Sequence, residues 1–418
     1  MPDAPILILL AAPAPSPGGS RSAPVPAVGL EILGLSLVKR AALAARRAGF
    51  GEVLLVGEQA SAIPEAISVS GWADLAARLP PGQTAPLAIA PATVLAEKDW
   101  LEKLVEKDAA PPAAWAAAAD RRIVMLAAAK APHALRAFDE WGATDLRAVE
   151  AALERLFGPA ERLSAGVDPL VVEGPGDRPE AERRLLRKLV KDTDGFMARH
   201  VERPISLQIS RVLAPTAITP NQMSVISILV GVFAGPFFLS SRPCLQTAGA
   251  LLFLAHSILD GCDGELARLR FQQSRLGGVL DFWGDNLVHV VIFACMAVGW
   301  SWAVGVRWPL LLGAGAVVGT LGSAGVVYWR LMREKDGDES LFTSVSAEPE
   351  RPLARMLDAA SRRDFIYLVA LLALAGKSSW FVLLAGIGAP IYCLLVVFLA
   401  ARERRSGDEG KPRAARGA

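Results

Sequence analysis

Four aspartates recur at short, regular intervals in the second half of the chain. Asp260 and Asp263 are three residues apart, and Asp281 and Asp285 are four apart, so each pair falls on one face of a helix. Carboxylates are costly within apolar segments of membrane length and are usually functional when they occur there. Four of them around one cleft cannot all stay ionised without cations. Because oxygen ligands suit Mg²⁺ or Mn²⁺, and Mg²⁺ sites commonly include substrate phosphates, the spacing predicts a metal site for a phosphorylated ligand.

Small residues accompany these aspartates. Gly264 and Ala267 continue the first helix face and Gly277 continues the second, so a flat or phosphorylated ligand has room to approach the backbone. A short turn near Gln272–Ser274 would bring the two faces together. The alternative is a pair of core helices with capped or buried carboxylates, although buried acids are rare unless they are paired or bound to metal.

The whole stretch reads D-x-x-D-G-x-x-A-R-x8-G-x3-D-x3-D, and every fixed position resembles the signature of the CDP-alcohol phosphatidyltransferase family. The resemblance implies that the four aspartates hold two Mg²⁺ or Mn²⁺ ions and that Asp285 is also the base for an acceptor hydroxyl. It places four further residues around the CDP moiety: Gly264, Ala267, Arg268 and Gly277. Glu265, at a variable position, is expected to face the cytoplasm. His256 and His289 are interpreted as core histidines, with a role beside the aspartates as the alternative.

The entry to the first long apolar segment reads Ile218-Thr-Pro-Asn-Gln222. Thr219 or Asn221 can cap a helix there, and Pro220 suits its first turn. The family carries a similar Thr-Pro-Asn near its nucleotide pocket, so the resemblance adds Asn221 to the expected CDP contacts. Just before it, residues 196–213 alternate apolar with basic side chains, which is typical of a helix at the membrane interface.

Composition separates the chain into two halves. Of the 418 residues, 52% are hydrophobic, and the mean hydropathy of +0.36 is high for a soluble protein. All four cysteines fall in the apolar half after Gln222, which argues against a disulfide framework or a zinc site. The net charge of +2 is too small to indicate nucleic acid as a partner. Six segments are predicted to span the membrane: Met223–Ser240, Leu245–Leu259 running on into the aspartate motif, Leu276–Val298, Leu310–Tyr328, Phe365–Ala375 and Trp380–Ala400.

The charges between these segments are unevenly distributed. If the N-terminus is cytoplasmic, the outer loops carry only Arg242, Arg307 and Lys377, whereas the inner loops and the tail carry the other basic residues of this half. This asymmetry predicts a multi-pass protein of the plasma (inner) membrane, with both termini and the aspartate motif at the cytoplasmic face. We also expect a homodimer.

Residues 5–174 alternate between strand-like and helix-like segments, which predicts a mostly parallel sheet covered by helices. The predicted strands are Pro5–Ala11, Glu52–Val56, Pro86–Ala90, Arg122–Leu126 and Pro169–Val172, and the predicted helices are Leu35–Ala48, Lys98–Lys107 and Ala148–Leu156. The layout resembles the nucleotidyltransferase fold, best over Val28–Val56. More specifically, it resembles the cytidylyltransferase domain of bifunctional inositol-phosphate cytidylyltransferase and di-myo-inositol phosphate phosphate synthase fusions. Residues 181–195 are similar to the basic connecting helix of those fusions.

The positions that would carry nucleotidyltransferase chemistry depart from this resemblance. Where the family has a glycine-rich phosphate loop, the chain has three prolines between Ala11 and Arg21, and these remove amide donors. The expected lysine is missing around Pro24–Pro26, and Ala90-Pro-Ala92 stands where a metal-binding aspartate is expected. The sequence therefore predicts a degenerate domain without catalytic activity.

The predicted organisation has four parts. They are a nucleotidyltransferase-like α/β domain over residues 1–176, connecting and interfacial juxtamembrane helices over 177–215, an all-α membrane domain of six transmembrane helices over 216–402, and a disordered basic tail over 403–418.

These features predict a membrane phosphotransferase that uses a CDP-alcohol donor and an alcohol or polyol-phosphate acceptor and releases CMP. The fused domain and the Arg362-Arg-Asp-Phe365 start of the fifth span resemble the inositol-phosphate-transferring branch, which favours a polyol-phosphate product. Three arginines are the expected contacts of the acceptor phosphate: Arg203, Arg362 and Arg363. Two alternatives stay open. One is a CDP-diacylglycerol-dependent phosphatidyltransferase of phospholipid biosynthesis, and the other is a non-enzymatic transporter or scaffold that uses the acids as an ion site.

Overall fold

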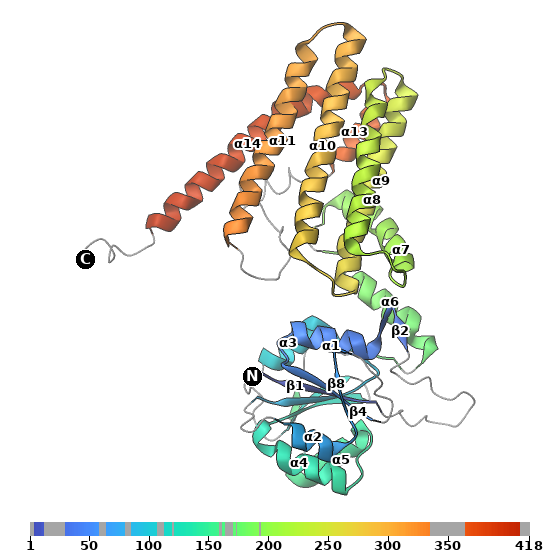
Figure 1. The fold of residues 1–418 in the computed structure, drawn as a ribbon, viewed down its shortest axis with the longest axis vertical. Helices are drawn as coiled ribbons and strands as arrows, with labels where there is room; N and C mark the ends of the chain where they lie inside the picture. The colour runs from blue at the N-terminus through green and yellow to red at the C-terminus, as the bar shows by residue number, and fades with distance from the viewer. Residues whose placement is uncertain are drawn as a thin grey trace. The chain divides into compact units, whose positions relative to one another are not determined.

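A computed structural model of the chain describes residues 4–11, 30–57, 64–79, 85–106, 113–118, 121–158, 161–163, 170–172, 174–191, 194–334 and 364–409. These residues belong to two compact units, Met1–Lys188 and Leu189–Ala418, and each unit is described by itself. The first is an α/β unit and the second is helical (Figure 1). The four functional parts expected from the sequence stay a prediction.

A seven-stranded sheet forms the centre of the first unit, in the order β10-β8-β9-β6-β1-β4-β5. Four of its neighbouring pairs are parallel, and β9 is antiparallel to both β6 and β8. All five residues of β1 are buried, as expected for a central parallel strand covered on both faces. The predicted mostly parallel α/β architecture is confirmed. The strands are β1 (Ile6–Leu10), β4 (Glu52–Val56), β5 (Ile67–Val69), β6 (Leu87–Pro91), β8 (Ala113–Ala118), β9 (Arg121–Leu126) and β10 (Glu161–Leu163).

Helices cover both faces of this sheet: α1 (Leu37–Arg47), α2 (Trp72–Arg78), α3 (Lys98–Glu106), α4 (Ala131–Glu140) and α5 (Leu146–Phe157). Figure 1 shows α1 and α3 on one face and α2, α4 and α5 on the other. On the second face the rings of Trp72 and Phe138 pack 5.0 Å apart within an aliphatic core. The Trp72 indole N–H donates to the carbonyl of Ala143 at 2.6 Å, which satisfies the polar end of a buried side chain.

Short elements complete the first unit: the β2 (Glu31–Ile32) and β3 (Leu35–Ser36) hairpin, β7 (Val94–Leu95) with β11 (Leu170–Val171), the 3₁₀ turns Ala128–Lys130 and Pro175–Asp177, and α6 (Arg178–Arg187). The predicted strand Pro169–Val172 thus pairs antiparallel with β7 in a sheet of its own, outside the main sheet. Arg184 and Lys188 hold α6 in place through ion pairs of 2.9 and 2.5 Å to the buried carboxylate of Glu97.

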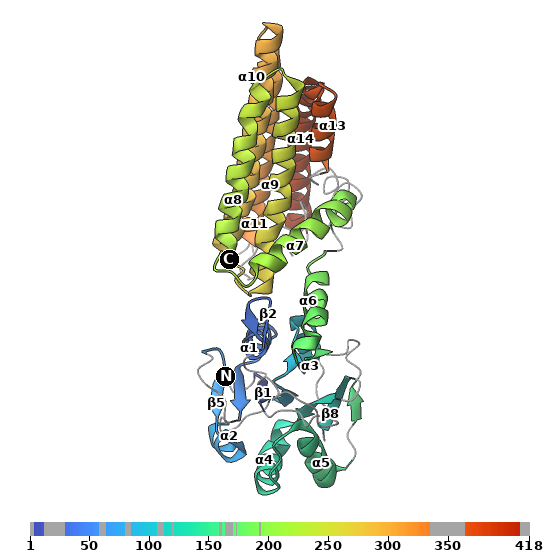
Figure 2. The ribbon, with the colours of Figure 1, turned by 90° about the vertical axis from the view of Figure 1, so that its right-hand side faces the viewer.

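The second unit consists of helices: a π-helical turn η4 (Ala198–Glu202), α7 (Arg203–Leu213), α8 (Pro220–Ala234) with its 3₁₀ extension η5 (Gly235–Leu239), α9 (Pro243–Leu269), α10 (Arg275–Val304), α11 (Trp308–Glu334), α13 (Phe365–Leu374) and α14 (Ser378–Glu409). Figure 2 shows α8, α9 and α10 side by side along the bundle, with α7 running across its lower end.

Five helices among the described residues are long and apolar enough to cross a membrane. They are Pro220–Leu239, Pro243–Leu269, Arg275–Val304, Trp308–Trp329 and Ser378–Arg402. The fifth predicted span is a shorter apolar helix of 10 residues, Phe365–Leu374. It ends where Gly376 adopts a left-handed backbone with φ +65°, directly before Lys377. Ten residues rise only about 15 Å, half of a hydrocarbon core, so the count of six spans is not confirmed.

Close contact between α8 and α10 depends on glycine beside the aspartate motif. A Cβ added at Gly284 would lie 2.2 Å from Cδ1 of Ile228, and one added at Gly231 would lie 2.6 Å from a methyl carbon of Val288. Without side chains at these two positions, the helix backbones approach closely. This packing brings the start of α8 to the same end of the bundle as the motif.

Candidate functional site

The chain reverses direction between α9 and α10, at the turn that the spacing predicts. Beyond the end of α9, the N–H of Gln272 donates to the carbonyl of Ala267 at 2.8 Å, and Phe271 adopts a left-handed backbone with φ +57°. Ser274 then caps α10 by accepting from the N–H of Gly277 at 3.1 Å. The turn therefore brings the aspartate-bearing ends of the two helices to one junction.

Three of the four motif aspartates meet at this junction. Asp260, Asp281 and Asp285 each offer a carboxylate oxygen, and these oxygens lie within 4.8 Å of one another. Asp260 is buried, whereas the other two are partly exposed. Oxygen ligands about 2.1 Å from Mg²⁺ are at most about 4.2 Å apart, so small side-chain adjustments would complete a divalent-metal site. The donor set, made of oxygen atoms alone, fits Mg²⁺ or Mn²⁺.

The fourth aspartate makes different contacts. Asp263 is buried, and its carboxylate accepts from the hydroxyl of Ser224 on α8 and from the N–H of Gly264. It is not one of the three residues whose oxygens gather in the described structure. Its role as a metal ligand stays a prediction, and binding would require its side chain to leave Ser224.

His256 is a neighbour of the cluster that the sequence interpretation placed in the core. Its Nδ1 lies 2.8 Å from the carbonyl oxygen of Ser227, and its Nε2 lies 3.5 Å from Oδ1 of Asp285. A carbonyl can only accept, so Nδ1 donates to Ser227 and the ring is fixed with Nε2 toward Asp285. The sequence signal was its position four residues before Asp260. His289 instead packs among phenylalanine rings, 5.3 Å from that of Phe365, as expected for a core histidine.

The residues expected to contact CDP lie in two small groups. A Cβ at Gly277 would lie 2.9 Å from Oδ1 of Asn221, and a Cβ at Gly264 would lie 3.3 Å from Nη1 of Arg268. Each glycine thus keeps open backbone beside a polar side chain. Ala267 lies half-buried on the same helix. The Nε of Arg268 is buried and has no hydrogen-bond partner among the described residues.

Thr219, and not Asn221, caps α8. The Thr219 hydroxyl accepts from the N–H of Gln222 at 3.3 Å, and the Gln222 side chain accepts from the N–H of Thr219 at 2.9 Å. This capping box satisfies the helix start without the Asn221 amide. The side chain of Asn221 therefore remains available to face Gly277.

Arg270 holds the loop that leads into this cap. Its guanidinium donates five hydrogen bonds of 2.5 to 3.0 Å to backbone carbonyls between α7 and α8. The acceptors are Leu213, Ala214, Thr216 and Ile218. From sequence, Arg270 was counted only among the inside charges. Its partners are backbone atoms of a loop more than fifty residues away, which no side-chain pattern records.

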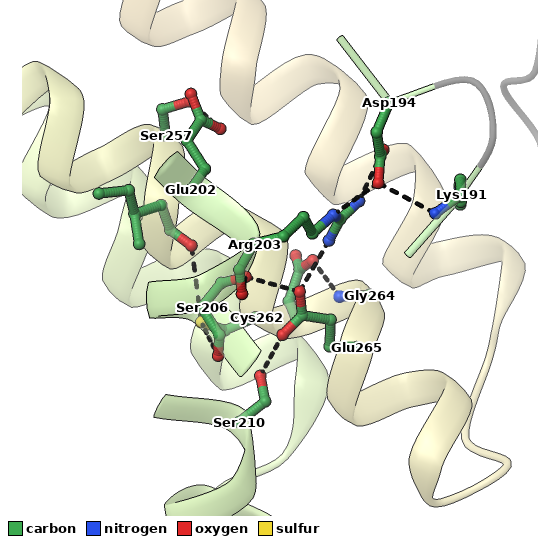
Figure 3. A network of polar contacts seen from close by, with 12 residues as sticks. Lys191, Asp194, Glu202, Arg203, Ser206, Ser210, Ser257, Cys262, Gly264 and Glu265 are labelled. Carbon is green, nitrogen blue, oxygen red and sulfur yellow. Dashed lines mark hydrogen bonds and ion pairs between the residues drawn. The ribbon is translucent and has the colours of Figure 1, made fainter. Parts of the chain in front are cut away.

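Glu265 lies at the centre of a buried network between α7 and α9 (Figure 3). Its carboxylate accepts from Arg203 Nη1, Ser206 Oγ and Ser210 Oγ, each at 2.7 Å. The expectation that Glu265 faces the cytoplasm is wrong, because its side chain is completely buried and all three of these partners belong to α7. The signal available in the sequence was the i, i+4 pair of serines in α7.

Arg203 also binds Asp194 through two hydrogen bonds, of 2.8 and 3.0 Å. Burial alone would raise the pKa of Asp194, but the hydrogen bonds and charge of Arg203 outweigh it and bring that pKa below its ordinary value. Burial would likewise lower the pKa of Arg203, yet Asp194 and Glu265 together raise it. The guanidinium of Arg203 is therefore already balanced by two carboxylates. The other two expected acceptor contacts, Arg362 and Arg363, lie outside the described residues.

Comparisons with known proteins place these features in a family. The model of the CDP-alcohol phosphatidyltransferase family matches residues 217–356, which include the aspartate motif. A "Bifunctional IPC transferase and DIPP synthase" of Thermococcus kodakarensis is 41% identical over 127 residues, covering 30% of this chain and 28% of that protein. The alignment thus spans less than a third of that relative. An "Archaetidylinositol phosphate synthase" of Pyrococcus horikoshii is 30% identical over 178 residues, covering 41% of this chain and 86% of the relative.

Among solved structures, the phosphatidylinositol phosphate synthase of Mycobacterium tuberculosis with CDP-DAG bound aligns at 19% identity, with a TM-score of 0.33. That alignment covers 47% of this chain and 93% of the other. At this level the likeness carries no argument of its own. The family model covers the aspartate motif, which lies where two apolar helices meet, and the alignment with the Pyrococcus relative covers most of that protein. The chain therefore belongs to the CDP-alcohol phosphatidyltransferase family.

Proposed function

We propose that this multi-pass membrane protein transfers a substituted phosphate from a CDP-alcohol to an acceptor hydroxyl and releases CMP. The observation that carries the proposal is the gathering of Asp260, Asp281 and Asp285 at the end of two apolar helices. A non-enzymatic ion site would need the carboxylates alone. The adjoining Gly264 and Gly277, with Arg268 and Asn221 beside them, are better explained by a bound nucleotide.

In this proposal the three clustered aspartates, joined by Asp263, hold two Mg²⁺ or Mn²⁺ ions. Bound there, the ions would neutralise and orient the diphosphate of the donor. The acceptor oxygen attacks the β-phosphorus, a new phosphorus–oxygen bond forms, and the bond to the bridging oxygen breaks so that CMP leaves with that oxygen. Asp285 takes the proton of the acceptor hydroxyl, and His256 keeps its carboxylate oriented from behind.

The remaining CDP contacts are proposed from their positions. Arg268 suits a phosphate, because its planar guanidinium offers several donors to oxygen atoms. Asn221 faces Gly277, where a ligand can approach the backbone. Gly264 has no side chain and Ala267 has only a methyl group, so a ligand can approach the backbone of α9 at these positions.

For the acceptor, we propose an inositol phosphate or a similar polyol phosphate. The name of the Pyrococcus relative, "Archaetidylinositol phosphate synthase", supports this choice. A second candidate is phosphatidyl transfer from CDP-diacylglycerol. It is favoured by a "CDP-diacylglycerol--serine O-phosphatidyltransferase" of Mycobacterium bovis, 35% identical over 92 residues that cover 31% of that relative.

The setting of the reaction is also proposed. We place the site at the cytoplasmic face of the plasma membrane, with both termini on that side, and we expect a homodimer. The α/β unit is proposed to be a degenerate nucleotidyltransferase. Ala90 and Ala92 lie buried at the end of β6, where the resemblance requires a metal-binding aspartate. The proline-rich loop and the missing lysine, between Ala11 and Pro26, fall mainly outside the described residues.

The test is release of CMP by the full chain in vesicles with Mg²⁺ or Mn²⁺. CDP-inositol and CDP-diacylglycerol are supplied in turn, each with inositol phosphate. We expect release with one donor, and loss of release on adding EDTA or in the Asp263→Asn and Asp281→Asn variants. Retained activity in either variant would contradict that metal ligand. No release with either donor, together with carboxylate-dependent ion uptake, would instead support the transporter.

A further inference from the structure

Three cations lie along the aspartate-bearing end of α9: Lys191, Arg203 and Arg268. The N–H of Lys191 donates to Asp194, and Asp194 pairs with Arg203. A Cβ at Gly261 would lie 3.5 Å from Nη1 of Arg203, and one at Gly264 would lie 3.3 Å from Nη1 of Arg268. Burial, and then the two arginine charges, lower the pKa of Lys191. Arg203 also acts on Arg268, which lies near Glu265, Asp194 and Asp263. A cluster of like charges is unfavourable by itself, and a bound anion relieves it.

One of the three cations, Arg203, already forms ion pairs with carboxylates. Arg203 pairs with Asp194 at 2.8 Å and with Glu265 at 2.7 Å. Neither Lys191 nor Arg268 forms an ion pair within 4.0 Å in the part of the chain that the structure describes. The buried Nε of Arg268 lacks a hydrogen-bond partner there as well. Such a donor is costly to bury unless something accepts from it, so this buried Nε points to a ligand.

The network around Arg203 also fixes the backbone of Lys191 (Figure 3). The N–H of Lys191 donates to Asp194 at 3.0 Å, and Arg199 donates to the carbonyl of Lys191 at 3.2 Å. The carboxylate of Asp194 in turn accepts hydrogen bonds from Nε and Nη2 of Arg203. Lys191 is therefore anchored at both of its peptide groups, close enough to the motif for its charge to act on Asp281.

We propose that Lys191 and Arg268 form a subsite for a substrate phosphate beside the aspartate cluster. The ligand is a phosphate group, which reaches the subsite either in the diphosphate of the CDP-alcohol or on a polyol-phosphate acceptor. The subsite deepens the proposed function and rests on it for the identity of the substrate. Lys191 takes the place of Arg203 as the juxtamembrane cation that contacts phosphate.

Charge balance supports this assignment. Without divalent ions, Asp263 and Asp281 offset part of the charge on Arg268 and Lys191 at a distance. Two divalent cations on the aspartates would remove that compensation. A phosphate held between the metal site and the two side chains would restore it, with charge-assisted hydrogen bonds to each cation.

The first test compares Lys191→Met with Lys191→Arg in the full chain. We expect Lys191→Met to raise the KM of a phosphate-carrying substrate about tenfold, the effect of losing one charged hydrogen bond, while kcat changes little. Lys191→Arg should keep most of the affinity. Lys377→Met, in the loop between α13 and α14, is the matched control and should behave as wild type. A higher KM for the CDP-alcohol identifies the diphosphate as the ligand, and a higher KM for the polyol phosphate identifies the acceptor.

A second measurement separates this inference from the reaction itself. Inorganic pyrophosphate and phosphate are titrated against the thermal unfolding of the purified chain with Mg²⁺ present. Stabilisation of the wild type that is lost in Lys191→Met supports the subsite, even if the chain releases no CMP. If CMP is released but both KM values match wild type and pyrophosphate stabilises both proteins equally, the subsite is wrong. Absence of any stabilisation by either anion would also overturn it.

Discussion

Asp285 has two kinds of neighbour: the carboxylates of Asp260 and Asp281 on one side and the buried imidazole of His256 on the other. Because the Ser227 carbonyl fixes Nδ1 of this ring, Nε2 is the atom that faces Asp285. A residue behind a metal ligand orients it, and its loss typically costs about 10- to 100-fold in activity or metal affinity.

Replacing His256 tests this orientation. In His256→Asn the amide can still donate to Ser227 but cannot reach Asp285, whereas in His256→Gln it can reach toward Asp285. We expect His256→Asn to lose about 10- to 100-fold in kcat/KM and His256→Gln to lose less. CMP release measured across Mg²⁺ concentrations would show the difference. His289→Asn, on the same side of the bundle, is the control, and equal losses in all three variants would argue for a packing role alone.

Single residues also show how far the sequence could be interpreted. The four aspartates were predictable because their spacing alone sets the helix face on which each lies. Which of them gather, and what stands behind them, depends on contacts across the bundle. The serine that binds Asp263 lies 39 residues earlier, and the carboxylate that binds Arg203 lies 62 residues later. No periodic pattern encodes such pairs, so Glu265 was misplaced and Arg270 was counted only among the inside charges.

At the scale of elements, the contact between α7 and α9 depends on a buried ion pair. Glu265 is fully covered, and its partner Arg203 has only 15% of its side chain exposed. Removing one member leaves a buried charge without compensation, at a cost of about 3–5 kcal/mol, whereas replacing both by apolar residues can be neutral. The pair therefore fixes where α7 lies more than it adds to net stability.

A double-mutant cycle checks this account. Glu265→Met alone should lower the thermal unfolding midpoint clearly, and Arg203→Met alone should do the same. The combined variant should recover much of the loss. If the double variant is as unstable as the sum of the two single ones, the two residues are not coupled and the pair does not position α7.

The same contact should respond to acid. The folded-state pKa of Asp194 lies below its unfolded value of about 3.9, so its stabilising effect is complete above that value and is lost as the pH falls through the folded pKa. We expect the unfolding midpoint of wild type to drop below about pH 4 more steeply than that of Asp194→Asn. Parallel curves for the two proteins would mean that Asp194 does not contribute.

The sequence predicted some helices and strands more accurately than others. The apolar segments were long enough to reveal five spans, whereas the fifth predicted segment, which ends before Lys377, forms a helix too short to be counted with them. In the α/β unit, both bounds of β4 were predicted to the residue. Gly49 ends the preceding helix and Gly57 follows the strand, and these two glycines limit where the strand can begin and end. The strand β8 was missed. Its sequence, Ala113-Ala-Trp-Ala-Ala-Ala, has the composition of a helix, and its pairing with β9 overrides that local preference.

For the whole molecule, the two compact units raise the question of whether the first retains chemistry. The buried alanines at the end of β6 leave no carboxylate for a metal at that position. We expect the full chain to release no pyrophosphate from CTP and a polyol phosphate, even when it releases CMP from a CDP-alcohol. Pyrophosphate formation above that of a blank would show the domain to be active.

The length of α10 has a consequence for the choice of membrane. This helix has 30 residues and extends about 45 Å, well beyond a hydrocarbon core of about 30 Å. Trp300 packs against Trp308 at one end, where aromatic residues mark a lipid boundary. Counted from Trp302, Asp285 lies about 26 Å away and Asp281 about 31 Å away, so the carboxylates straddle the opposite boundary.

A site at that depth is open to a soluble substrate from the water and to a lipid-linked one from the acyl chains. It is also sensitive to bilayer thickness. In vesicles made from lipids of increasing chain length, we expect CMP release to pass through a maximum and then to fall as the hydrocarbon submerges the aspartates. A rate that does not depend on chain length would mean that the carboxylates lie clear of the acyl region. If CMP release does pass through a maximum, the acyl composition of the host membrane is one of the conditions that set the rate of this protein.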